Sequence, residues 1–157
     1  PHWQVMQESL RKDMRQLLKS WYILYFQIPW LPEKMSSTGS FRMMANALVQ
    51  TSRKGTFLEE DLQCYRQAWG QPGAIASMIN WYRAAARGIA DTAANNRIVV
   101  PTLILWGALD HFLEASLAER SLDLCQQGRL VTYDSCGHWL HQEEPDLINR
   151  EMLDFLT

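Results

Sequence analysis

The chain has 157 residues, the length of one ordinary domain, so it can bury a sizeable core without disulfides or a structural metal. Hydrophobic residues make up 47% of the chain and charged residues 20%, which is typical of a globular protein. The net charge of -2 disfavours nucleic acid as a partner, and no apolar run approaches the roughly 18 residues that a membrane-spanning helix needs. Seven tryptophans favour a deep apolar core or an apolar ligand pocket.

The three cysteines, Cys64, Cys125 and Cys136, lie far apart in the sequence. Their spacing matches neither a metal site nor an even-numbered disulfide framework, so we expect no metal and a reducing compartment, the cytoplasm. The chain begins at Pro1 without an initiator methionine and without a charged-then-apolar leader. We therefore expect it to be part of a longer protein.

The first half of the chain has a helical pattern. Residues 4–26 contain neither Gly nor Pro and repeat apolar side chains at approximately helical spacing, which predicts a helix that ends before Pro29. Pro29 and Pro32 cannot continue a helix cleanly, so a turn is expected there, followed by a polar loop over residues 36–40. Further helices, separated by glycines and prolines, are predicted over residues 41–51, 59–69 and 74–87.

The second half has a different pattern. Residues 98–107 (IVVPTLILWG) are apolar and rich in β-branched side chains, which predicts a parallel strand that is buried on both faces. A helix over residues 113–125, a second strand over 129–133 and a closing helix over 145–155 are expected to follow. This order is typical of the end of a doubly wound α/β sheet. Because two strands do not make such a sheet, its other strands are expected upstream of Pro1 or in another chain.

Two titratable side chains follow the two predicted strands. The functional loops of an open α/β sheet leave the carboxyl ends of its strands, and Asp110 and His138 lie in those loops. An acid followed by a histidine in this order matches the acid and base of a hydrolase triad, whose nucleophile comes earlier in the chain. Each residue alone could instead be structural, Asp110 as a helix N-cap and His138 as a turn residue. Their shared context favours catalysis.

Other titratable residues lack this context. Glu114 could replace Asp110 as the acid, but it suits the exposed first turn of the following helix, where its charge interacts favourably with the helix dipole. His2 has no catalytic context, and His111 and His141 are expected at the surface.

Four segments of the chain resemble known hydrolases. Residues 101–110 (PTLILWGALD) and 136–145 (CGHWLHQEEP) resemble the C-terminal portion of the α/β-hydrolase fold family. Residues 21–33 (WYILYFQIPWLPE) and 80–83 (NWYR) resemble the two tyrosine-bearing segments in the helical cap of the epoxide hydrolases. The resemblance covers nearly the whole chain, and the paired cap segments are its more specific part.

The resemblance implies an α/β fold in two regions. A helical cap, or lid, would occupy residues 1–90, and the C-terminal portion of an α/β-hydrolase core would occupy residues 91–157. The sequence contains no nucleophile elbow such as Gly-x-Asp-x-Gly or Gly-x-Ser-x-Gly, and no oxyanion loop containing His-Gly. We therefore expect these residues to be chemically incomplete and to need a missing N-terminal half of the core for a complete sheet.

By the same resemblance, Tyr22 and Tyr82 are the cap residues that bind the epoxide oxygen. The leaving group of an epoxide is an alkoxide, so ring opening near neutral pH needs a proton donor or hydrogen-bond donors at that oxygen. Tyr25 lies on nearly the same helix face as Tyr22 and competes for this role, but the family pattern favours Tyr22. Both tyrosines could instead be ordinary amphipathic residues with solvated hydroxyls. The residues expected to bind substrate are Trp21, Tyr25, Phe26, Trp81, Phe112 and Trp139.

The resemblance further implies a two-step reaction whose partners are a small hydrophobic epoxide and water. An upstream Asp attacks an epoxide carbon to form an alkyl ester, and a water molecule activated by His138 hydrolyses the ester to a vicinal diol. Asp110 orients His138 in the second step. Because side chains and water supply all of this chemistry, no cofactor is expected.

Three alternative functions are open from the sequence. A haloalkane or haloacid dehalogenase of the same fold would hold a halide with Trp or His, and Trp21 and Trp81 are compatible with this. A serine esterase would carry Ser at the elbow, whereas epoxide or halide chemistry would carry Asp there. The third alternative is a non-catalytic role, as a truncated pseudoenzyme or a binding module.

Overall fold

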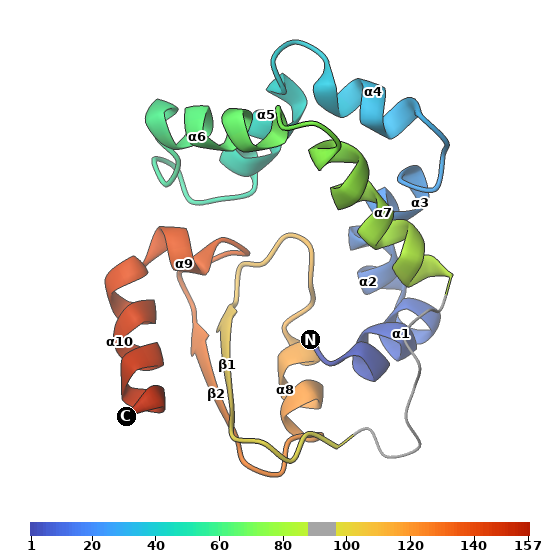
Figure 1. Ribbon diagram of the computed structural model, residues 1–157. Helices are drawn as coiled ribbons and strands as arrows, with labels where there is room; N and C mark the ends of the chain where they lie inside the picture. The colour runs from blue at the N-terminus through green and yellow to red at the C-terminus, as the bar shows by residue number, and fades with distance from the viewer. Residues whose placement is uncertain (88–96) are drawn as a thin grey trace. The chain divides into compact units, whose positions relative to one another are not determined.

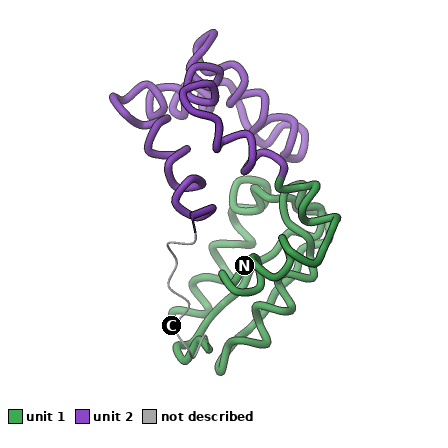
Figure 2. Tube along the Cα trace, turned by 90° about the vertical axis from the view of Figure 1, so that its right-hand side faces the viewer, with its two compact units in different colours: residues 1–20, 92–157 green, residues 21–91 purple. Residues whose placement is uncertain are grey.

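A computed structural model of the chain describes residues 1–87 and 97–157 (Figure 1). The chain forms two compact units, which Figure 2 shows in different colours. One unit comprises Pro1–Ser20 together with Thr92–Thr157, and the other comprises Trp21–Asp91. We call the first the sheet unit, because it contains the two strands, and the second the helical unit.

Two parallel strands form the centre of the sheet unit. Strands β1 (Thr102–Gly107) and β2 (Gly128–Tyr133) pair in parallel along their whole lengths, which confirms the predicted parallel arrangement. The continuous ladder begins at Thr102, because Pro101 has no N–H to donate, and Ile98 forms an isolated parallel bridge with Cys125. The prediction that the first strand is buried on both faces was wrong for most of its length, since only Trp106 and Gly107 are buried.

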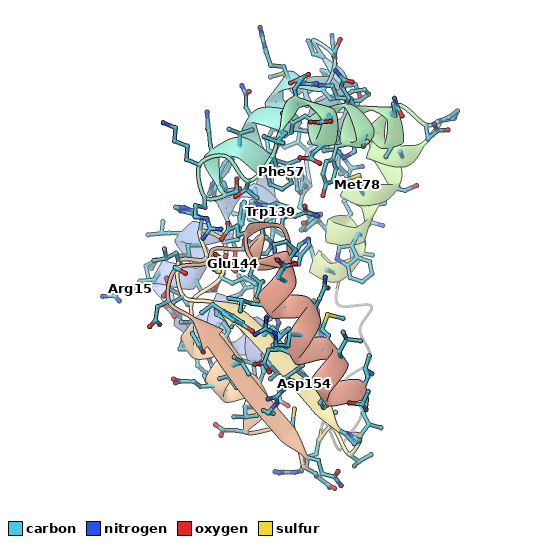
Figure 3. All side chains as sticks on the ribbon, turned by 90° about the vertical axis from the view of Figure 1, so that its left-hand side faces the viewer. Arg15, Phe57, Met78, Trp139, Glu144 and Asp154 are labelled. Atoms are coloured by element: carbon cyan, nitrogen blue, oxygen red, sulfur yellow. The ribbon has the colours of Figure 1, made fainter. Side chains whose placement is uncertain are left out.

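Helices cover both faces of these strands. Helix α10 (Pro145–Leu156) lies along one face, the side toward the viewer in Figure 3. Helices α8 (Ser116–Leu122) and α1 (Trp3–Lys12) lie on the other side (Figure 1). The core between α1, α8 and β1 consists of Val5, Trp106, Leu117 and Ala118. Two short helices, α2 (Met14–Lys19) and α9 (Leu140–Glu143), complete the described part of the unit.

The described part of the helical unit contains five helices. They are α3 (Trp21–Tyr25), α4 (Leu31–Ser37), α5 (Arg42–Gln50), α6 (Glu59–Trp69) and α7 (Ala74–Ala86). Helix α7 contacts α3, α4 and α6, and α5 contacts α4 and α6. The predictions of α5, α6 and α7 from apolar spacing are confirmed, because Ala45, Leu48, Leu62, Ile75 and Ile79 are buried at helical intervals.

Two predictions for the first 40 residues were wrong. The single helix expected over residues 4–26 is three helices, because the Asp13 carboxylate accepts hydrogen bonds from the N–H groups of Arg15 and Gln16 and thereby starts α2. The turn and loop expected after Pro29 contain α4. Pro32 lies in the first turn of α4, where its missing N–H has no helical partner to lose.

The first 20 residues of the expected cap region, residues 1–90, belong to the sheet unit. Val5 of α1 is buried against α8 and β1, so residues 1–20 pack with the strands rather than with the helices that follow. The expected boundary between residues 90 and 91 lies outside the described residues. Among the described residues, no helix has the length and apolar character needed to cross a bilayer.

Candidate active site

The acid and the histidine predicted from the sequence meet at the carboxyl ends of the two strands. Asp110 lies in the loop after β1 and His138 in the loop after β2. The Nδ1 atom of His138 is 2.9 Å from Oδ2 of Asp110, which confirms the expected hydrogen-bonding distance between the two side chains. Parallel pairing brings this about, because it places the ends of both strands at the same edge of the sheet.

The two oxygens of Asp110 have different partners. Oδ1 accepts hydrogen bonds from the N–H groups of Phe112 (2.7 Å) and Leu113 (3.0 Å), whereas Oδ2 faces His138. The N-cap-like role considered from the sequence and the contact with His138 therefore coexist in one carboxylate. Burial raises the pKa of Asp110, but the His138 imidazole and the two N–H groups outweigh burial and hold the pKa below its usual value.

Two aromatic rings flank the His138 imidazole. The ring centroids of Phe112 and Trp139 lie 4.9 Å and 5.1 Å from that of His138, both in edge-to-face geometry. Figure 3 labels Trp139 beside α9. Because ionised Asp110 can only accept hydrogen bonds, Nδ1 of His138 carries the proton of the neutral ring, and Nε2 is its basic nitrogen. The His138 side chain is 34% exposed, so this pair can accept a proton from a bound water molecule.

The two loops are joined by backbone hydrogen bonds beyond the ends of the strands. The N–H of Ala108 donates to the carbonyl of Tyr133 (3.0 Å), and that of Leu109 donates to the carbonyl of Cys136 (2.9 Å). A Cβ atom at residue 107 would collide with the carbonyl oxygens of Cys136 and Gly137. Residue 107 must therefore lack a side chain for the two loops to approach this closely, and glycine meets this requirement.

Side chains outside the two loops also bind them, and the sequence does not predict these contacts. The buried Glu143 carboxylate accepts a hydrogen bond from the N–H of Gly137 at 2.6 Å, directly before His138 in the chain. Gln16 and Lys19 of α2 bind the loop that carries Asp110. The Gln16 and Lys19 contacts span 96 and 91 residues of sequence, so no local pattern could identify them.

The tyrosines predicted for the cap contact each other within the helical unit. Tyr22 of α3 and Tyr82 of α7 lie with ring centroids 5.7 Å apart in edge-to-face geometry. Phe26 packs against both of them, at 5.8 Å and 4.9 Å. The Tyr25 ring instead contacts Trp21 and Phe26. Burial raises the pKa of Tyr82, which keeps its phenol protonated and able to donate a hydrogen bond.

Arg83 fixes the two tyrosine-bearing helices to each other. Its guanidinium donates to the carbonyl oxygens of Phe26 (2.9 Å) and Ile28 (2.8 Å), which follow α3. It also binds both carboxylate oxygens of Glu33 and the side-chain oxygen of Asn80. These contacts use the fork geometry of a guanidinium, which a lysine cannot reproduce. Arg83 belongs to the NWYR segment, residues 80–83, and the sequence does not predict this clamp.

The other candidate residues differ in how far their side chains are exposed to solvent. Trp21 and Trp81 are 63% and 75% exposed, and their expected role in substrate binding stays a prediction. His111 and His141 are exposed, as expected. Glu114 pairs with Lys19 at 3.1 Å and lies before α8 rather than in its first turn. No cluster of three or more His, Cys, Asp or Glu side chains among the described residues could hold a metal ion.

Comparison with known proteins identifies relatives over almost the full chain, although no protein-family model matches it. The chain is 36% identical to AB hydrolase superfamily protein YfhM of Bacillus subtilis (strain 168), covering 99% of this chain and 54% of that protein. It is also 36% identical to human epoxide hydrolase 4, covering 99% of this chain and 44% of that protein. The chain thus spans about half the length of the curated relatives it matches.

Solved structures share the fold. An epoxide hydrolase from Bacillus megaterium, solved as a point mutant, superposes with a TM-score of 0.81 at 20% sequence identity. The match covers 97% of this chain and 56% of that one. The described architecture is therefore a C-terminal portion of the fold that these enzymes share, as expected from the sequence.

We predict that Gly107→Ala separates the two loops. The added methyl group meets backbone atoms that cannot rotate away, so we expect a loss of unfolding free energy of about 1–3 kcal/mol. The His138 Nδ1–H proton resonance should also weaken in NMR spectra. Ala108→Ser, which adds an atom at the exposed neighbouring residue, is the control. An alanine variant with unchanged stability and spectrum would contradict the proposed close packing.

A second prediction concerns the pH dependence of stability. Because the pKa of Asp110 is lower in the folded state, its ionisation stabilises the fold above the unfolded-state pKa. This stabilisation is lost as pH falls through the folded-state pKa. The difference in unfolding free energy between wild type and Asp110→Asn should therefore shrink between about pH 7 and about pH 3 in urea denaturation. Asp134→Asn, at an exposed site after β2, is the matched control. A constant Asp110 difference would refute the assignment.

Proposed function

We propose that this chain, which has the fold of the α/β hydrolases, forms the cap and the C-terminal part of the core of an epoxide hydrolase. The contact between Tyr22 and Tyr82 carries the epoxide assignment, since it brings two phenols from different helices together. The Asp110–His138 pair supports hydrolysis more generally. In this proposal the helical unit acts as the cap and supplies the two phenols that bind the epoxide oxygen.

The first step of the proposed reaction opens the epoxide. A carboxylate oxygen attacks one epoxide carbon, the bond between that carbon and the ring oxygen breaks, and the oxygen takes a proton from a tyrosine. Tyr22 and Tyr82 stabilise the developing negative charge on the oxygen by hydrogen bonding. We propose that an Asp outside these 157 residues supplies the nucleophile, in keeping with the greater length of the relatives.

The second step releases the diol. Nε2 of His138 takes a proton from water while the water oxygen attacks the carbonyl carbon of the ester. The ester bond then breaks, the carboxylate is restored, and the protons return to the diol oxygen and the tyrosine. Asp110 stabilises the imidazolium that forms during this step. Phe112 and Trp139 pack beside the imidazole, and we propose that they contact the apolar part of the substrate.

His138→Gln should block the second step alone. In the protein that joins this chain to its nucleophile-bearing segment, the variant should still form the ester but hydrolyse it about 10²–10⁴ times more slowly. Intact-protein mass spectrometry after incubation with styrene oxide should then detect a covalent adduct. His141→Gln, at an exposed position, should turn over without accumulating it. A folded His138→Gln protein that forms no adduct would refute the division of steps.

Replacing both cap phenols should block the first step. We expect Tyr22→Phe combined with Tyr82→Phe to slow adduct formation about 10²–10³ times, because ring opening would lose both hydrogen-bond donors. The same mass measurement, made in a His138→Gln background, isolates this step. Tyr25→Phe is the matched control, since Tyr25 lies on the same helix but packs against Trp21. If Tyr25→Phe alone abolishes the adduct, the role belongs to Tyr25.

A further inference from the structure

Helix α2 binds the loop that carries Asp110 through a fully buried amide. The Gln16 side chain is 0% exposed, and its Nε2 donates to the carbonyl oxygen of Phe112 and to Oγ of Ser20, each at 2.9 Å. Its Oε1 accepts a hydrogen bond from the N–H of Glu114 at 2.8 Å. The amide therefore holds a backbone acceptor and a backbone donor two residues apart, which fixes both the loop and the orientation of the amide.

Lys19 adds a second, more exposed contact from the same helix. Its ammonium group donates to the carbonyl oxygens of Asp110 (2.9 Å) and Leu113 (3.3 Å) and pairs with Glu114. Water competes with these contacts because the Lys19 side chain is 30% exposed, but it cannot reach the Gln16 amide. Gln16 is thus the water-excluded anchor of the loop.

The segment of backbone that Gln16 binds also orients the Asp110 carboxylate. Oδ1 of Asp110 is held by the N–H groups of Phe112 and Leu113, so the position of this turn determines where Oδ2 points. Only one direction places Oδ2 2.9 Å from Nδ1 of His138. A shift of the turn would move Phe112 as well, whose ring packs against the imidazole.

We propose that Gln16 is a positioning residue for water activation, acting through the 110–114 loop on the Asp110–His138 pair. The expected slowing of ester hydrolysis rests on the proposed function. The expected change in the orientation of Asp110 toward His138 rests on the geometry alone. Because ester formation does not use His138, loss of Gln16 should slow the second step selectively. A residue that served only to stabilise the fold would not separate the two steps.

The test uses Gln16→Met, which keeps the volume of the side chain and removes its polar atoms. In the protein with its nucleophile-bearing segment, we expect ester hydrolysis to slow about tenfold or more, while ester formation changes by less than about twofold. Single-turnover mass spectrometry with styrene oxide measures both rates. The His138 Nδ1–H proton resonance should weaken or shift upfield, because the orienting carboxylate has moved.

Two controls separate positioning from stability. Ser9→Ala removes another buried polar side chain of the sheet unit, which binds Arg120 and not the loop. Ser20→Ala removes the third partner of Gln16 and leaves both loop contacts in place. Both variants should keep the resonance and the ratio of the two rates, even where they lower the unfolding free energy. Gln16→Asn, whose amide is too short to span both loop groups, is the second variant if Gln16→Met does not fold.

An unchanged Nδ1–H resonance in a folded Gln16 variant would overturn the proposal, whatever the substrate. Equal slowing of both steps, or the same rate ratio in Ser9→Ala, would also overturn it, because either result indicates general loss of structure. If the resonance weakens but no variant, including His138→Gln, forms an adduct, the positioning of the pair is supported and the epoxide chemistry is refuted.

Discussion

The structure of the site depends on the close approach of two backbone segments at Gly107. Parallel pairing does not stop at the end of the strands, since Ala108 and Leu109 continue to donate hydrogen bonds to the loop after β2. The carbonyl groups of Cys136 and Gly137 occupy the space that a side chain at residue 107 would need. The acid and the base are therefore brought together by backbone geometry.

In each unit, polar side chains bind the main chain of a loop and thereby stabilise the loop. Gln16 binds the carbonyl of Phe112, Glu143 binds the N–H of Gly137, and Arg83 binds the carbonyls of Phe26 and Ile28. A buried backbone group that lacks a partner costs free energy, so such a contact both satisfies the loop and fixes it. The proposed chemistry is divided between the units, and each unit holds its own reactive groups rigid by this means.

The sequence predicted those parts of the fold whose signals are local. Apolar spacing and glycines located α6 and α7 because these helices bury one face and end at clear breaks. Asp110 and His138 were found because parallel strands place their following loops at a common edge. Pro32 does not distinguish a turn from a helix start, because a proline that ends one helix is equally suited to begin the next.

Apolar periodicity failed along α2, where the buried side is polar. Leu17 and Leu18 are 40% and 67% exposed, whereas Gln16 between Arg15 and Leu17 is fully buried. A glutamine is ordinarily at the surface, and its burial here is compensated by three hydrogen bonds, two of them to the backbone of a loop about a hundred residues away. Only the folded chain supplies those partners, so no rule that reads neighbouring residues could predict this position.

The hydrogen bonds from Arg83 to the segment after α3 do not depend on which side chains that segment carries. Carbonyl oxygens are common to every residue type, so the clamp recognises the path of the chain after α3 and is indifferent to the side chains at Phe26 and Ile28. The same holds for Gln16 and the side chain of Phe112. Exchange of a side chain at such a position therefore leaves these hydrogen bonds in place, and its effect comes through ring packing, of Phe26 on the two tyrosines and of Phe112 on His138.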